Sequence, residues 1–172
     1  MATPELPSLG PGPRQGVDGL VPLTEKLDRV FADASFAGTR AVLARATVLL
    51  WHDHFAAAHA IAQEVETSDG SYVHAILHRR EPDYDNARYW FRHVGHHPCF
   101  PELAVRASAL LKSKHAPELE RKLIPSGQWN SLAFVDACEA VAEQPSGESQ
   151  VLLLRELQQV EFEVLLGHLV ED

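Results

Sequence analysis

Apolar side chains recur at helical spacing along most of this 172-residue chain, and this pattern predicts an all-α protein. No segment alternates apolar and polar residues between hairpin turns, as a half-buried strand would. The longest stripe predicts one helix over residues 39–67. Shorter stripes predict helices over residues 24–34, 71–80, 84–94, 102–114, 131–143 and 150–170. We therefore expect a single-domain helical bundle of about six to seven helices.

Turn-forming residues separate these stripes and place the helix ends. Asp69 and Gly70 indicate a turn, and Asp69 is expected to cap the helix that follows. Asp83 is expected to cap the helix over residues 84–94, and Gly95 suits its C-terminal end. Because short loops join antiparallel neighbours, the helices on either side of the Asp69–Gly70 turn should pack against each other.

The two ends of the chain differ in character. Residues 1–21 are rich in proline and glycine, which predicts a disordered tail or an arm lying on the surface of one helical domain over residues 22–172. Residues 150–170 begin with the apolar run Val151–Leu154, and their apolar residues cover more than one helix face. Such a helix is either buried at the centre of the bundle or part of a homodimer interface.

Composition excludes some classes of partner and indicates the cellular compartment. The net charge is −9, which argues against nucleic-acid binding and against docking on anionic membranes. No apolar run approaches the roughly 20 residues needed to span a bilayer. The two cysteines, Cys99 and Cys138, lack the spacing of a zinc finger or a disulfide framework. We interpret them as reduced thiols and expect a cytoplasmic protein.

Histidine is concentrated in one part of the chain: eight of the ten histidines lie within residues 52–97. His74, His78 and Glu81 are spaced four and three residues apart, so they share one helix face. Two histidines and a carboxylate at this spacing are a common open metal site.

The Asp69–Gly70 turn should place His59 and Gln63 beside this stripe. The side chains would then form a buried polar cluster that holds a divalent metal ion, or a hydrogen-bonded seam between two helices. The candidate metal ligands are His59, His74, His78 and Glu81.

Arginine and aromatic residues gather in the same region. Arginine suits bidentate capture of carboxylate or phosphate, and aromatic rings can stack on a ligand. The alternative is local pairing, such as Asp85 with Arg88. The candidate ligand-binding residues are Arg79, Arg88, Arg92, Tyr72, Tyr84 and Trp90.

Two functions follow from these candidates, and the sequence assigns no catalytic residue that would decide whether the protein is an enzyme. In the first, the side chains line a pocket for a small anionic ligand, together with a metal ion. In the second, they present an arginine face to an acidic peptide.

The histidine-rich region carries two resemblances. Tyr84, Ala87, Phe91 and Pro98 resemble the second helix of a tetratricopeptide or Sel1-type hairpin, although this unit occurs once. In addition, HDH at 52–54, DGSYVHAILHRREPDYDNARYWFRHVG at 69–95 and HP at 97–98 together resemble the signature of a family of small bacterial and fungal proteins. That resemblance implies a shared helical fold and a shared site, and it brings no reaction with it.

Overall fold

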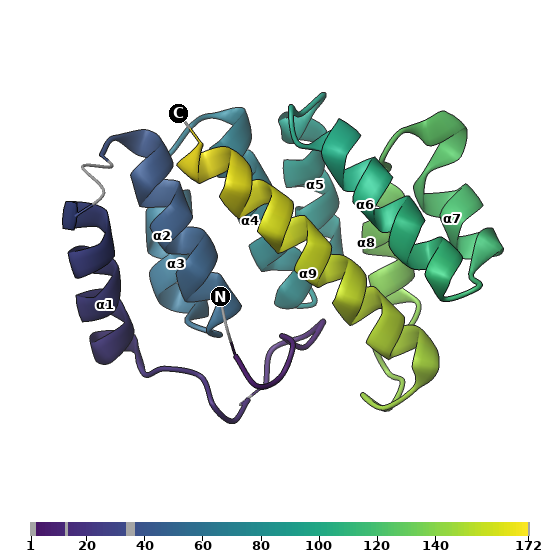
Figure 1. The fold of residues 1–172 in the computed structure, drawn as a ribbon, viewed down its shortest axis with the longest axis horizontal. Coiled ribbons are helices and arrows are strands. Elements are labelled where there is room, and N and C mark those ends of the chain that lie inside the picture. The colour runs from purple at the N-terminus through teal and green to yellow at the C-terminus, as the bar shows by residue number, and fades with distance from the viewer. Residues whose placement is uncertain (1–2, 13, 34–36, 172) are drawn as a thin grey trace.

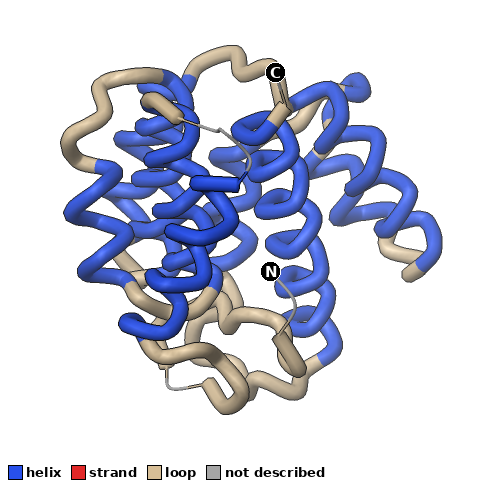
Figure 2. The backbone as a smooth tube through the Cα atoms, turned by 60° about the vertical axis from the view of Figure 1, so that its left-hand side comes forward, coloured by secondary structure: helices blue, strands red, loops and turns tan. Residues whose placement is uncertain are grey.

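The computed structural model describes residues 3–12, 14–33 and 37–171, and within these ranges it is all-helical with no strand (Figure 2), as predicted. The helices are α1 (Leu20–Asp33), α2 (Thr39–Trp51), α3 (Phe55–Ala62), α4 (Ser68–Arg80), α5 (Tyr84–Val94), α6 (Phe100–Ser113), α7 (Pro117–Leu123), α8 (Ser131–Glu139) and α9 (Ser149–Val170), with a short 3-10 helix at Pro125–Gly127.

The described residues contain more helices than predicted, for two reasons. The expected long helix over 39–67 is divided into α2 and α3, so that prediction was wrong. The short helix α7 was not predicted, because its seven residues are too few to show a periodic apolar face.

The break between α2 and α3 is made at Asp53, whose backbone has a φ of 66°. This left-handed conformation ends a helix and is costly for a residue other than glycine. Asp53 is held there by two buried arginines: Arg14 Nε donates to Oδ2 at 3.1 Å, and Arg80 Nη2 donates to Oδ1 at 2.6 Å. Contacts from distant parts of the chain therefore set the end of α2.

The turn between α3 and α4 is tight because residue 70 is glycine. A Cβ atom at Gly70 would lie 2.0 Å from the carbonyl oxygen of Val65, closer than any side chain can approach. Thr67 caps α4 by accepting a hydrogen bond from the Gly70 N–H at 3.0 Å, in place of the predicted cap Asp69. The chain reverses here, and α3 packs against α4.

Helix α9 crosses the near face of the molecule in Figure 1 and packs against α2 and α6. Leu154, Leu157, Phe162, Leu165 and Leu169 are all fully buried. These side chains are covered within one chain, whereas Leu152, in the apolar run at the start of the helix, is exposed. Among the described residues, no helix is both long enough and apolar enough to cross a membrane.

The N-terminal arm, described over residues 3–12 and 14–19, lies against the domain and leads into α1. Its backbone carbonyl oxygens accept hydrogen bonds from two helices. Arg155 Nε donates to Pro7 at 3.2 Å, Gln158 Nε2 donates to Ser8 at 3.1 Å, and Arg80 Nε donates to Ser8 at 3.2 Å. These contacts hold the described part of the arm against α4 and α9.

Candidate metal centre

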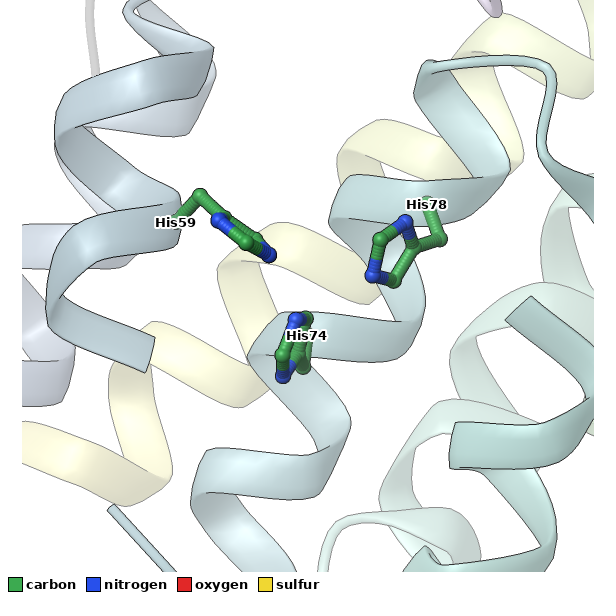
Figure 3. Close-up of side chains that lie close together, drawn as sticks. All are labelled: His59, His74 and His78. Atoms are coloured by element: carbon green, nitrogen blue, oxygen red, sulfur yellow. The ribbon is translucent and has the colours of Figure 1, made fainter. Parts of the chain in front are cut away.

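Three imidazoles from α3 and α4 converge on one point. His59 lies in the last turn of α3, and His74 and His78 lie one turn apart on α4; Figure 3 shows the ring of His59 facing the other two. One ligand atom from each lies within 4.8 Å of the other two. The ring centroid of His59 lies 4.7 Å from that of His74 and 5.6 Å from that of His78. The predicted convergence is confirmed for these histidines, whereas Gln63 is exposed.

His74 is the most enclosed member of the cluster, with 5% of its surface exposed. Its Nε2 atom is buried and has no hydrogen-bond partner. Leaving such an atom unpaired costs roughly 1–3 kcal/mol. Burial, and then the neighbouring His78 and His59, lower the pKa of His74 to about 4. The ring is therefore neutral near pH 7, which is the form that binds metal ions.

Trp90 on α5 fixes the orientation of His74. The two rings are stacked, with centroids 4.1 Å apart and planes 21° apart. His74 and His78 are also stacked, with centroids 4.8 Å apart. The indole therefore forms one wall of the cluster, a role that the sequence pattern did not suggest for it.

Glu81 acts on the cluster through His78. Its Oε2 atom lies 3.2 Å from His78 Nδ1, and Asp83 Oδ2 lies 3.9 Å from the same nitrogen. Burial lowers the pKa of His78, although both carboxylates oppose that shift. A carboxylate on one ring nitrogen orients the other toward an ion. Asn86 Nδ2 lies 3.2 Å from that nitrogen, His78 Nε2, so the amide has to move aside before this nitrogen binds an ion.

Glu81 itself does not belong to the group of mutually close ligand atoms, which consists of His59, His74 and His78. The structure therefore brings together three of the four predicted ligands and places the fourth beside one of them. Asn86 was missed because it follows the Pro82 turn, where helical spacing no longer relates it to His78.

A second cluster, formed by His97, Cys99 and His168, also has ligand atoms within 4.8 Å of one another. Its imidazoles are already paired, however. His97 Nε2 and His168 Nε2 donate to Asp69 Oδ1 at 2.8 and 3.0 Å, and the Cys99 N–H donates to His97 Nδ1 at 3.2 Å.

Two further features make this second cluster a poor cation site. The Arg40 guanidinium lies 3.4 Å from His168 Nε2, and its positive charge disfavours a metal ion there. Burial raises the pKa of the Cys99 thiol to about 12, so an ion would have to displace a firmly held proton to bind this sulfur. We interpret this cluster as a hydrogen-bonded network that joins α4 to α9.

The predicted ligand-binding residues are dispersed, and two of them are in the core. Arg79 and Tyr72 are both fully buried. Arg79 pairs with Glu161 of α9 through both oxygens of the carboxylate, and Tyr72 Oη donates to the same residue at 3.4 Å. The Arg79 guanidinium also lies 4.4 Å from the centroid of Phe134. This arginine is therefore committed to packing α4 against α9.

The other predicted residues of this group lie closer to the surface. Arg88 donates to Asp85 at 3.1 Å and to Asp136 at 2.9 Å, and it also pairs with Glu139. The predicted alternative of local pairing with Asp85 is thus present. Tyr84 is half-buried, whereas Arg92 is exposed.

Comparison with known proteins found no matching family model, no matching curated protein and no matching solved structure.

Proposed function

We propose that this protein binds a divalent transition-metal ion, with zinc as the first choice, through His59, His74 and His78. Imidazole nitrogen suits zinc, copper, nickel and iron, whereas magnesium and calcium prefer oxygen. The observation that carries the proposal is the buried, unpartnered Nε2 atom of His74, whose ring lies against two further imidazoles. A metal ion would satisfy this nitrogen.

Binding requires a modest adjustment of the rings. With metal–nitrogen distances of about 2.0–2.1 Å, tetrahedral ligand atoms lie about 3.4 Å apart. The three histidines are within 4.8 Å, so the rings must close in. His59 has the freedom to do so, since it is half-buried, whereas His74 is stacked on Trp90.

Three protein ligands leave a fourth coordination position for water or a small anion. This arrangement is typical of catalytic zinc sites, in which the ion lowers the pKa of bound water to about 7. The small anionic ligand expected from the sequence would bind at the ion in this account.

The test is zinc titration of the tag-free, metal-stripped protein by calorimetry. We expect one zinc ion per chain. His74→Ala should weaken binding by about 100-fold or more, since it removes one of three ligands. His168→Ala is the matched control, because it alters the second histidine cluster and should leave zinc affinity unchanged. Equal affinity in wild type and His74→Ala, or equal losses in both variants, would contradict the proposal.

A further inference from the structure

A cavity of about 630 Å³ lies between the end of α5, the start of α6 and the segment that leads into α8. It does not include the three histidines of the metal centre. Its walls carry both apolar surface and polar groups that lack a partner. The residues that bear on its chemistry are Arg92, Phe100, Pro101, Trp129, Ser131 and Leu132.

Arg92 supplies a positive charge at this cavity. Its side chain is exposed, and among the described residues it has no hydrogen-bond or ion-pair partner. Arg88, one turn earlier on the same helix, is tied to carboxylates of α8. The guanidinium of Arg92 therefore keeps its full hydrogen-bonding capacity for an anion.

Helix α8 supplies further donors. Asn130 caps this nine-residue helix by accepting the Ala133 N–H at 3.0 Å. The N–H groups of Ser131 and Leu132 lie in the first helical turn, where backbone donors have no acceptor within the helix. These groups and the helix dipole favour negative charge at this end.

Trp129 is the second independent indication of a ligand. Trp129 is among the residues that line the cavity, 6% of the residue is exposed, and its Nε1 atom is buried without a partner. An indole N–H normally finds an acceptor when it is buried. The unpaired indole N–H therefore belongs to a residue of the cavity wall, two positions before the start of α8.

The apolar part of the cavity wall indicates that the ligand has an apolar body in addition to its negative charge. Phe100, Pro101 and Leu132 offer a surface that an inorganic ion would leave uncovered. The single arginine suits one negative charge better than a polyphosphate, which generally draws several basic residues. We propose that the cavity binds a small organic carboxylate with an aromatic or other apolar body, with Arg92 and the start of α8 holding the carboxylate.

This proposal is independent of the metal centre, because the two sites share no residue. It is tested on the full chain after removal of metal ions, by calorimetry with phenylacetate as the probe. Phenylacetamide has the same body without the charge, and inorganic phosphate has the charge without the body. We expect phenylacetate to bind more tightly than either.

Arg92→Gln should weaken phenylacetate binding by roughly ten- to a hundredfold, the size of a lost charge-assisted hydrogen bond. Trp129→Phe should weaken it by a smaller factor, and Arg121→Gln, an exposed arginine on α7, should leave it unchanged. Equal binding of phenylacetate and phenylacetamide, tighter binding of phosphate, or an unchanged affinity in Arg92→Gln would each overturn the proposal.

Discussion

Burial of the His74 imidazole makes the stability of the metal-free protein depend on pH. In the unfolded chain this ring has its ordinary pKa near 6.5, whereas in the folded protein the pKa is about 4. Between these values the unfolded state binds more protons. The contribution of His74 to the free energy of unfolding is therefore fully present above about pH 6.5. It decreases as the pH falls toward 4, by about 3 kcal/mol for a pKa shift of this size.

We predict that replacing His74 and His78 together by alanine flattens this dependence. Urea unfolding of the metal-free protein between pH 4 and 7.5 measures it. The carboxylates of Glu81 and Asp83 moderate the contribution of His78, since they raise its pKa against the effect of burial. His93→Ala, at an exposed histidine of α5, should retain the wild-type slope. The same slope in the double variant would show that other groups govern the acid response.

The buried pair of Arg79 and Glu161 gives a second prediction for single side chains. Both side chains are fully buried, so removing one charge leaves the other without compensation. We expect Glu161→Gln to destabilise the fold by about 3–5 kcal/mol. Arg88→Ala, which breaks a solvent-exposed network, should cost only about 1 kcal/mol. Chemical denaturation compares the two, and a Glu161→Gln effect as small as that of Arg88→Ala would contradict this account.

The geometry of the metal centre depends on the turn between α3 and α4. At Gly70 an added Cβ would meet the Val65 carbonyl oxygen at 2.0 Å, so the two helices would have to separate. We predict that Gly70→Ala lowers both thermal stability and zinc affinity, because His59 moves away from His74. Gly167→Ala is the control: it lies inside α9, nothing is within 4 Å of its Cβ, and alanine there should stabilise by up to about 1 kcal/mol. Unchanged zinc affinity in Gly70→Ala would show that the geometry of the metal centre does not depend on this turn.

The elements that could be predicted from sequence are those with local determinants. Helix α5 begins and ends where predicted, because Asp83 caps it and Gly95 adopts a φ of 63° directly after it. The convergence of the three histidines could be predicted from sequence, because helical spacing relates His74 to His78 and a turn containing glycine relates both to His59.

The features that could not be predicted from sequence depend on contacts between residues far apart in the chain. The break at Asp53 is held by Arg14 and Arg80, which are 39 and 27 residues away. The burial of Arg79 depends on Glu161, 82 residues further along the chain. Because no local pattern relates such residues, Arg79 was indistinguishable from an arginine that binds a ligand.

For the whole molecule, the N-terminal arm joins helices that are far apart in sequence. Carbonyl groups of Pro7 and Ser8 accept hydrogen bonds from α4 and α9, and Leu9 is buried. We predict that deletion of residues 1–12 lowers the melting temperature by several degrees, since several contacts of about 1 kcal/mol each are lost. An unchanged melting temperature would mean that these contacts add nothing to stability.

Metal binding by three imidazoles of one chain can be observed by X-ray absorption at the zinc edge, recorded on protein loaded with one equivalent of zinc. We expect three imidazole nitrogens at about 2.0–2.1 Å and a fourth light ligand, with no sulfur. His168→Ala should give the same spectrum, whereas His74→Ala should retain at most two imidazole nitrogens, because one of the three ligands is gone. A sulfur ligand at about 2.3 Å, or imidazole scattering that is undiminished in His74→Ala, would contradict metal binding by these three histidines.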